Sequence, residues 1–383
     1  MHIAFHAPLK PPDHPVPSGD RRMARAFMDL LVSLGHEVEL ASRFRSYDRT
    51  GDERRQERLA RIGRELARRL VRRYRGRPPE MLPGLWFTYH LYHKAPDWLG
   101  PVVSTALRIP YVVAEASVAP KQAAGPWAIG FAASRAAIAR ADLVLAMTDQ
   151  DRAGLASVVS GPGRLHLFPP FLDTAPFAAA ALARGSARAR LAAASGLDME
   201  WPWLVAVAMM RADAKLLSYR LLARALAALA DRDWQLVVVG DGEARGTVEG
   251  LLAPLGAGRV HFTGAVPPEA LAGLLAACDL CVWPACNEAY GMALLEAQAA
   301  GLPVVAGAEG GVSDIVVDGS TGILVRPRDP LAFADAVRTL LDDPERRRVM
   351  GLAARAHVTA RHDVAAARAR LRPLLEASRC VSA

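Results

Sequence analysis

The second half of the chain alternates short apolar runs with helical stretches, and this alternation strongly constrains its fold. Five apolar runs predict strands at 204–208, 235–239, 260–262, 280–283 and 304–305. Helices are predicted between them. Strands and helices that alternate at this spacing form a parallel, doubly wound sheet, which binds ligands beyond the carboxyl ends of its strands. The sequence therefore predicts an α/β fold for this half.

The first half carries a looser version of the same pattern. A strand is predicted at 2–6, followed by a proline-rich loop at 8–18 and a helix that begins near Gly19. Further strands are predicted within 84–94, 109–117 and 141–146. A chain of 383 residues exceeds what one hydrophobic core normally serves, so two domains are expected.

The chain is basic, with a net charge of +8 and a pI near 9.7. Such a balance favours nucleic acid, anionic membranes or anionic ligands, so the position of the charge matters. Residues 51–77 form a predicted helix with a narrow apolar stripe of Leu59, Ile62, Leu66 and Leu70. The rest of its surface is covered by Arg54, Arg55, Arg58, Arg61, Arg64, Arg68, Arg69, Arg72 and Arg73.

Two interpretations of this arginine-rich helix remain open. Its arginines can form a solvated face whose partners are surface carboxylates. Alternatively, residues 52–77 dock on anionic lipid headgroups, with about 1 kcal/mol from each basic residue near a charged bilayer. Nucleic acid is not expected as a partner, because the segment lacks interleaved aromatic residues and no recognised nucleic-acid module accompanies it.

The four cysteines do not form a disulfide framework in a chain of this size. Cys278 and Cys281 have C-x-x-C spacing where a predicted helix meets a buried strand, so packing is expected rather than zinc or redox chemistry. No apolar run reaches the 18 residues typical of a membrane span. The opening residues resemble a strand rather than a signal peptide, so a cytoplasmic protein is expected. A monomer or weak homodimer is also expected.

The stretch from Asn287 to Val325 carries the clearest functional pattern. It opens in a loop that holds Glu288, and its apolar spacing then predicts a helix, with Glu288 at the mouth and Gly301 at the end. Glu296 lies eight residues further, inside an otherwise apolar face, where a carboxylate requires a partner. On one helix the two carboxylates would be about 12 Å apart. Glycoside hydrolysis requires a pair roughly 5–9.5 Å apart, so this spacing favours an elongated ligand instead.

Basic residues and glycines follow two other predicted strands. Arg211 and Lys215 leave the first strand of the second half ahead of a helix, where they suit a diphosphate. The alternative is a surface ion pair. Gly240 and Gly242 follow the next strand and open a helix. They do not complete a dinucleotide fingerprint, because Gly246 comes one residue late and no acidic ribose partner ends the next strand.

The E-x7-E motif of Glu288 and Glu296, followed by A-x-A-x-G-x-P-V-V and a glycine pair, resembles the nucleotide-sugar site of retaining glycosyltransferases of family four, or glycosyl transferases group 1. The resemblance covers most of 200–345 closely and the N-terminal half loosely. It implies the GT-B architecture, with two Rossmann-like doubly wound domains facing across a cleft. It also implies metal-independent transfer of a hexose, with retention, from a UDP- or GDP-linked sugar and without a further cofactor.

The resemblance also assigns roles in the second half. Glu288 is expected to contact the sugar hydroxyls, and Arg211 and Lys215 to stabilise the departing diphosphate. The expected donor-binding residues are Gly240, Gly242, Val266, Tyr290, Gly291, Met292 and Glu296. Of these, Glu296 is expected to contact the ribose hydroxyls. The acceptor is expected to be a glycan or lipid-linked molecule. The arginine-rich helix suggests a glycolipid or surface polysaccharide intermediate, handled at the inner face of the membrane.

Three residues of the first half are expected on the acceptor side: Gly19, His90 and Glu115. Family members carry a glycine pair where Ser18 and Gly19 stand, and often a histidine where this chain has Glu115. This departure leaves the acceptor-side chemistry open. Each candidate also has a structural interpretation, as an ordinary helix start, a satisfied histidine or a capped strand end.

The resemblance places the domains as well. Residues 1–170 are expected to form the acceptor-binding domain and 201–365 the nucleotide-sugar domain. A hinge is expected at 171–200, after two stiffening prolines. The final helix, 366–383, is expected to return toward the N-terminal domain.

Alternatives to this chemistry remain. Metal-dependent transfer would require Asp-x-Asp after a strand. Asp149-x-Asp151 and Asp231-x-Asp233 instead start a helix and precede a strand, which is typical of caps and turns. A nucleotide-sugar epimerase on the same fold would convert the sugar without any acceptor. A non-catalytic sugar-nucleotide or glycan binder would do neither, and the change at Glu115 keeps that possibility open.

Overall fold

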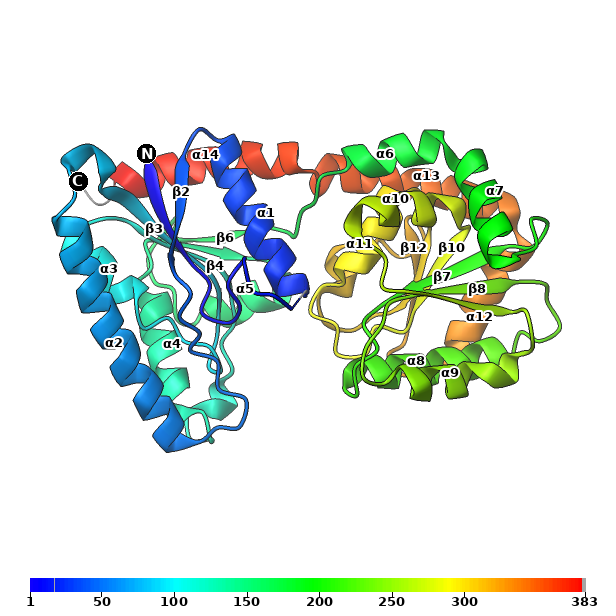
Figure 1. Cartoon of the computed structure of the whole chain (residues 1–383), viewed down its shortest axis with the longest axis horizontal. Helices are drawn as coiled ribbons and strands as arrows, with labels where there is room; N and C mark the ends of the chain where they lie inside the picture. The colour runs from blue at the N-terminus through cyan, green and yellow to red at the C-terminus, as the bar shows by residue number, and fades with distance from the viewer. Residues whose placement is uncertain (17, 381–383) are drawn as a thin grey trace. The chain divides into compact units, whose positions relative to one another are not determined.

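The computed structural model describes residues 1–16 and 18–380, and its chain forms two compact units (Figure 1). Unit 1 contains Met1–Phe171 together with the last helix, which begins at Val364. Unit 2 is continuous from Leu172 to Asp363. Each unit has its own six-stranded sheet and its own hydrophobic core.

The sheet of unit 1 consists of parallel strands in the order β2-β1-β3-β4-β5-β6. These are β1 (His2–His6), β2 (Glu37–Ser42), β3 (Pro83–Leu91), β4 (Tyr111–Ala116), β5 (Leu143–Ala146) and β6 (Leu165–Leu167). The helices are α1 (Gly19–Ser33), α2 (Glu53–Arg75), α3 (Gly100–Leu107), α4 (Ala128–Arg140), α5 (Asp149–Leu155) and α14 (Val364–Cys380). The strand order reverses between β1 and β3, which makes this pair a topological switch point.

Unit 2 has a second parallel sheet, in the order β12-β11-β10-β7-β8-β9. Its strands are β7 (Trp203–Val207), β8 (Gln235–Val239), β9 (Val260–Gly264), β10 (Leu280–Trp283), β11 (Val304–Gly307) and β12 (Gly322–Val325). Its helices are α6 (Ala175–Leu182), α7 (Arg184–Ser195), α8 (Ala214–Ala227), α9 (Arg245–Leu252), α10 (Pro268–Ala277), α11 (Met292–Ala299), α12 (Pro330–Asp342) and α13 (Pro344–Arg361). Counted within the unit, this is the Rossmann order, with its switch point between β7 and β10.

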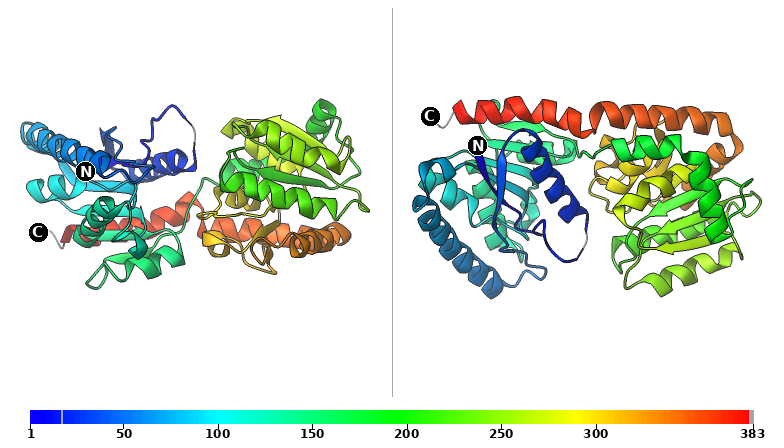
Figure 2. Two further views of the ribbon diagram at one scale, coloured as in Figure 1. Left: turned by 90° about the horizontal axis from the view of Figure 1, so that it is seen from below. Right: turned by 45° about the horizontal axis from the view of Figure 1, so that its top comes forward.

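Helices cover both faces of each sheet, so the predicted doubly wound α/β fold is confirmed (Figures 1 and 2). In unit 2, α8 packs between α9 and α12, while α10 packs with α6 and α7. In unit 1, α2 packs on α3 and α4, and α14 packs on α1. The central strands are nearly continuous apolar runs, as parallel sheets buried on both faces require.

Two strands were not predicted from the sequence. β6 has three half-buried residues, and β12 has four, of which three are half-buried. Both pair with a single neighbour at one edge of their sheet. Edge strands of this length carry too few apolar residues to stand out against the surrounding loops.

The segment 171–200, predicted as a hinge, is largely helical and groups with unit 2. Arg184 and Arg188 of α7 both reach the carboxylate of Asp279, at 2.6 and 2.8 Å, which attaches α7 to the end of α10. The chain leaves unit 1 after Phe171 and returns to it at Val364.

The two ends of unit 2 are bonded to each other. The Leu172 N–H donates to the carbonyl oxygen of His362 at 2.9 Å. The Thr174 hydroxyl donates to the Asp363 carboxylate at 2.5 Å. The last residues before the chain re-enters unit 1 are therefore fixed beside the first residues after it leaves.

The buried face of α2 differs from the predicted stripe. Leu70 is buried, but Ile62 is 41% exposed. The helix instead packs through small residues such as Ala60, Gly63 and Ala67. A Cβ on Gly63 would overlap the Cβ of Trp98, so close approach of the helix decides which face is buried.

Cys278, Cys281 and Cys286 are buried free thiols, and the side chain of Cys380 lies outside the described residues. Burial raises the pKa of Cys281 to about 12 and that of Cys278 further, which agrees with the predicted packing role. Among the helices within 1–16 and 18–380, none combines the length and apolar character that crossing a bilayer requires.

Candidate functional site

The switch point of unit 2 brings together two loops that carry sequence-predicted residues. One loop follows β7 and leads into α8, which begins at Ala214. The other follows β10 and leads into α11, which begins at Met292. The chain turns to opposite faces of the sheet after these neighbouring strands, and doubly wound sheets bind their ligands at such a point. The region between the two loops is called the crevice below. Arg211, Lys215 and Glu288 all lie on these connections or on the first turn that follows them.

Lys215 and Glu288 form an ion pair across this crevice. The Lys215 Nζ lies 2.5 Å from Glu288 Oε2, and the two side chains are only 17% and 16% exposed. The indole N–H of Trp283 donates to the same carboxylate oxygen at 3.3 Å. The Lys215 ammonium also lies 5.6 Å from the centroid of the Trp283 ring. A pair this shielded from water is stronger than a surface salt bridge.

Arg211 stands at the mouth of the same crevice and is 45% exposed. Its Nε lies 3.2 Å from Asp213 Oδ2, so it forms the surface ion pair that the sequence left as an alternative. Asp213 also caps α8, since its carboxylate accepts from the Lys215 N–H at 2.9 Å. Lys215 is therefore placed by a capped helix start, whereas Arg211 extends into solvent.

Glu288 lies in the loop ahead of a helix, as predicted from the sequence, but not on the helix that carries Glu296. α11 begins at Met292, and Glu288 lies in the preceding loop. Three residues of this loop have left-handed backbone, with φ of 57° at Ala285, 49° at Asn287 and 80° at Gly291. The loop doubles back on itself, so the 12 Å separation expected along one helix does not apply. The free N–H groups at the start of α11 remain available to an anion.

The Gly310-Gly311 turn supports this loop from the neighbouring strand β11. The Gly311 N–H donates to the carbonyl oxygen of Ala289 at 2.7 Å. Gly310 has φ of +62°, and a Cβ there would overlap the carbonyl oxygen of Glu288. The turn therefore requires glycine for two reasons, its left-handed backbone and its close approach.

Arg328 supports the loop from the outside. Its Nη2 lies 3.4 Å from the amide oxygen of Asn287 and 3.4 Å from the carboxylate of Glu309. Sequence reasoning missed both Arg328 and Trp283. Trp283 had a usable signal, since it ends an apolar run directly before the loop. Arg328 lies 41 positions after Asn287, and no pattern in the sequence links it to this loop.

Glu296 and Tyr290 are both buried, Glu296 within the packed face of α11. Gly240 and Gly242 shape the crevice from β8, because a Cβ on either would overlap a carbonyl oxygen of the segment after β7. Val266 lies further along the same edge, in the loop after β9, and packs against the core. The structure thus places the predicted donor-binding residues along one edge of one sheet.

The switch point of unit 1 holds the three residues predicted on the acceptor side, with Asp20 added. His90 Nδ1 lies 2.9 Å from Asp20 Oδ1 and 3.2 Å from Glu115 Oε1. The pairing of β3 with β4 sets His90 opposite Glu115, and both have left-handed backbone, with φ of 60° and 55°. Gly19 starts α1 immediately before Asp20. Asp20 is the member that sequence reasoning missed.

Charge interactions set the protonation of the cluster formed by Asp20, His90 and Glu115. Burial alone would lower the pKa of His90, but the charges of Glu115 and Asp20 outweigh it and raise the pKa to about 9. Burial raises the pKa of Glu115, although the imidazolium opposes the rise. The three side chains also have the composition of a metal site, with donor atoms within 4.8 Å of one another. A histidine ligand must be neutral, so the proton on His90 competes with any cation.

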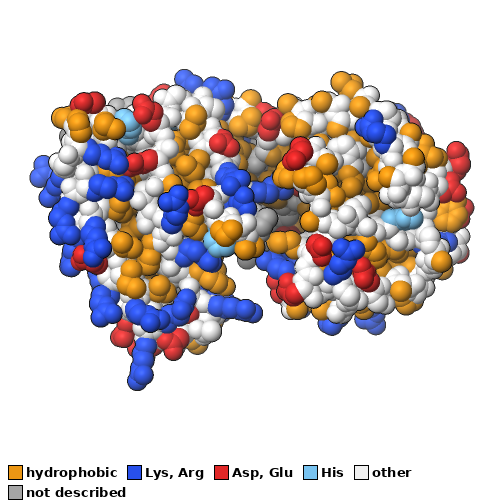
Figure 3. All heavy atoms as spheres, in the orientation of Figure 1, with side chains coloured by type: hydrophobic (Ala, Val, Ile, Leu, Met, Phe, Trp, Pro, Cys, Tyr) orange, Lys and Arg blue, Asp and Glu red, His pale blue; other side chains and the backbone are white. Residues whose placement is uncertain are grey.

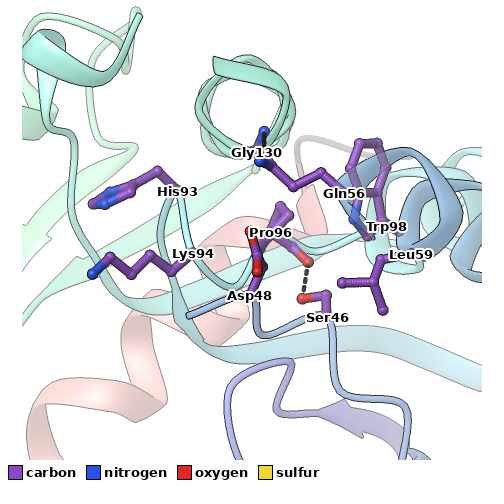
Figure 4. Close-up of a pocket in the computed structure, with 9 residues that line it drawn as sticks. All are labelled: Ser46, Asp48, Gln56, Leu59, His93, Lys94, Pro96, Trp98 and Gly130. Carbon is purple, nitrogen blue, oxygen red and sulfur yellow. Dashed lines mark hydrogen bonds between the residues drawn. The ribbon is translucent and has the colours of Figure 1, made fainter. Parts of the chain in front are cut away.

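A small hollow lies elsewhere in unit 1, between the starts of α2 and α4 and the loop after β3 (Figure 4). The Ser46 hydroxyl donates to the carbonyl oxygen of Pro96 at 2.6 Å. The Gln56 side chain donates to the Pro126 carbonyl at 2.8 Å and accepts from the Gly130 N–H at 3.1 Å. These polar groups join separate loops, so their role is structural.

Comparisons with known proteins identify similar sequences and folds. The family model described as "Glycosyl transferases group 1" matches residues 209–357. The chain is 32% identical over 297 residues to D-inositol 3-phosphate glycosyltransferase of Nocardia farcinica, covering 72% of this chain and 63% of that protein. It is 45% identical over 132 residues to the enzyme of the same name from Corynebacterium diphtheriae, covering 33% of this chain and 31% of that protein. Each alignment thus spans less than two thirds of the relative.

Solved structures resemble the whole chain at low identity. Sucrose-phosphate synthase from Thermosynechococcus elongatus has a TM-score of 0.74 at 23% identity, covering 98% of both chains. Anabaena Alr3699/HepE in complex with UDP and glucose has a TM-score of 0.70 at 18% identity, covering 98% of this chain and 99% of that one. At these identities the likeness establishes the fold, which is GT-B.

Proposed function

We propose that this chain, which belongs to the glycosyl transferases group 1 family, transfers a hexose from a nucleoside diphosphate sugar to an acceptor, with retention and without a metal. The observation that carries the proposal is the Lys215–Glu288 pair at the switch point of unit 2. It sets one ammonium and one carboxylate side by side where a sugar and a diphosphate must also lie side by side. The start of α11 adds N–H dipoles next to both.

The difficult step in such a transfer is departure of the nucleoside diphosphate from the anomeric carbon. Negative charge then develops on the leaving phosphate. Fixed cations and N–H groups stabilise that charge more than they stabilise the bound substrate, and this lowers the barrier. Lys215 and Arg211 supply the cations, and the first N–H groups of α11 supply the dipoles. Glu288 orients the sugar through its hydroxyls.

Two comparisons favour particular substrates. Alr3699/HepE, which shares the fold, was solved with UDP and glucose, so we favour a UDP-linked over a GDP-linked donor. The aligned relatives are named for D-inositol 3-phosphate, so a small phosphorylated polyol joins the glycan and lipid-linked acceptors as a candidate. On the acceptor side, the Asp20–His90–Glu115 cluster offers groups that bond hydroxyls.

Nucleotide binding tests the donor site directly. UDP at 100 times its dissociation constant should stabilise the protein by about 2.7 kcal/mol, which raises the melting temperature by roughly 5–10 °C. Arg211→Ala should reduce this shift, because a cation next to the diphosphate is lost. The measurement is a thermal-shift titration with UDP, GDP, ADP and their glucose or mannose conjugates.

Arg346→Ala is the matched control, since Arg346 is an exposed arginine on α13 of the same unit. It should leave the shift unchanged. Stabilisation by none of these nucleotides would contradict the donor site. Conversion of the sugar without any acceptor would indicate an epimerase instead, and binding without turnover would indicate a non-catalytic binder.

We also propose that the enzyme works at the inner face of an anionic membrane, through α2. This helix carries ten arginines and three glutamates, so it holds seven of the chain's eight net positive charges. All ten arginines are exposed, and Figure 3 shows Lys and Arg side chains gathered on the side of unit 1 where Figure 1 draws α2. Arg54, Arg58 and Arg61 have no ion-pair partner within the residues that the structure describes. A solvated ion-paired face would satisfy more of them.

Vesicle flotation tests the membrane proposal. The wild type should float with phosphatidylglycerol vesicles at low salt, with less binding at high salt because exposed charges are screened. The double change Arg58→Glu and Arg61→Glu should reduce flotation strongly, since it reverses two charges of the unpaired region. Arg224→Glu with Arg346→Glu makes the same net change on unit 2 and should leave flotation nearly intact. Absence of wild-type binding at low salt would end the proposal.

A further inference from the structure

The Trp283 side chain is held by both a ring contact and a hydrogen bond. Trp283 ends β10 and is buried. Its ring packs edge-on against Tyr219, with ring centroids 5.0 Å apart and an interplanar angle of 77°. The Tyr219 hydroxyl is itself bonded to the carbonyl oxygen of Ala208 at 3.0 Å, in the segment after β7. The Trp283 ring therefore packs on a tyrosine of α8 that is itself bonded to the segment after β7.

The loop after Trp283 returns the Glu288 carboxylate to that N–H. Glu288 lies five positions after Trp283, and the left-handed residues Ala285 and Asn287 reverse the chain between them. The loop is held in this shape by the Gly311 N–H and by Ser218 Oγ, which accepts from the Cys286 N–H at 3.0 Å. Strained backbone of this kind persists only where its surroundings maintain it.

Both donors reach the same oxygen. Trp283 Nε1 and Lys215 Nζ donate to Glu288 Oε2, and within the described residues Oε1 has no hydrogen-bond partner. A carboxylate accepts on both oxygens, so Oε1 keeps its full capacity for a ligand. Lys215 alone would not fix the carboxylate, because a flexible ammonium can follow either oxygen. The rigid indole, by contrast, donates to Oε2 and not to Oε1.

We propose that Trp283 is a positioning residue that holds Oε2 of Glu288 against the protein and thereby presents Oε1 to the hydroxyls of the donor sugar. The role of Oε1 rests on the proposed function, whereas the indole–carboxylate bond does not. Trp283 thus acts on the sugar through Glu288 and leaves recognition of the nucleotide to other residues. Phenylalanine at this position would keep the packing on Tyr219 and remove only the N–H.

The bond itself is tested without substrate. Trp283 is one of seven tryptophans, and its indole N–H resonance is identified in a ¹H–¹⁵N spectrum by its loss in Trp283→Phe. In ligand-free Glu288→Gln this resonance should shift, because the acceptor loses its charge. Glu345→Gln, on α13 of the same unit, should leave it unchanged. An indole resonance that ignores Glu288→Gln overturns the proposal, whatever the enzyme catalyses.

The positioning role is tested with the donor. Trp283→Phe should lower kcat/KM for the nucleotide sugar about tenfold, since a hydrogen bond to a charged group is lost, while the dissociation constant of UDP stays within twofold. In a Glu288→Ala background, Trp283→Phe should have no further effect on kcat/KM, because the side chain through which both changes act is absent. Additive effects would mean that Trp283 only stabilises the fold, and would overturn the role.

Trp234→Phe is the structural control. Trp234 is a buried tryptophan of the same core whose indole donates to the Leu229 carbonyl at 2.9 Å, away from the crevice. Trp234→Phe should lower the melting temperature about as much as Trp283→Phe does, and it should leave kcat/KM for the donor unchanged. If the wild type turns over no nucleotide sugar, the proposed function fails, and the indole resonance alone decides whether Trp283 holds Glu288.

Discussion

Glu288→Gln is expected to lower kcat/KM for the nucleotide sugar by about 100- to 1,000-fold, as removal of a preorganised polar group at a transition state does. Glutamine has the same shape and still accepts the Trp283 N–H. It cannot pair with Lys215, however, and it offers a neutral group to hydroxyls that the carboxylate would bind more strongly. Steady-state kinetics with the donor identified by thermal shift measures the effect.

The same variant must also be shown to fold. Breaking a shielded ion pair by removing one partner can cost up to about 3–5 kcal/mol, so its melting temperature is measured alongside. Glu345→Gln removes the charge of an exposed glutamate paired with Arg348 on α13 and should change neither quantity much. Wild-type turnover by a folded Glu288→Gln would refute the assignment of Glu288 to the donor site.

Gly310→Ala is expected to destabilise unit 2 by about 3 kcal/mol or more and to abolish transfer. Its Cβ would overlap the carbonyl oxygen of Glu288, and its φ of +62° disfavours any side chain. The turn or the loop must then move, and the Glu288 carboxylate moves with it. Denaturant unfolding gives the stability change, and single-turnover assays at temperatures where the variant is folded give the activity.

Gly319→Ala isolates the backbone effect. Gly319 has φ of +73°, but a Cβ there would meet nothing within 4 Å. It should cost roughly 1–2 kcal/mol and leave transfer intact. If the two variants behave alike, close approach of the glycine turn to the donor loop is not what positions Glu288.

Much of the fold could be predicted because its central strands are strongly apolar. β8 and β10 have the predicted bounds, 235–239 and 280–283, since each is a buried run between clear helix signals. The edge strands β6 and β12 could not be found this way, because they are short and half-buried. The buried face of α2 was also predicted wrongly. Gly63 is buried because Trp98, from a distant segment, packs directly against it, and the pattern of apolar residues does not show this contact.

The site shows the same division between local pattern and distant contact. Glu288, Arg211 and Lys215 could be selected from spacing and from their place after strands. The bond between Lys215 and Glu288 could not be predicted, because they lie 73 positions apart in the chain and the left-handed residues of the loop decide where Glu288 lies. His90 and Glu115 were named separately, but only the β3–β4 register and their shared backbone conformation bring them together.

Unit 1 is built from two separate parts of the chain, residues 1–171 and the last helix, α14. This division affects the order in which the two units can fold. During synthesis the polypeptide leaves the ribosome from its first residue onward. Residues 172–363 are continuous and can form unit 2 as soon as they emerge. Residues 1–171 cannot complete their core until α14 is made, because Ala367, Leu371 and Leu375 of this helix are buried in unit 1. The domain made first is therefore completed last, and a fragment that stops at Asp363 would expose the apolar surface of α1 that α14 covers.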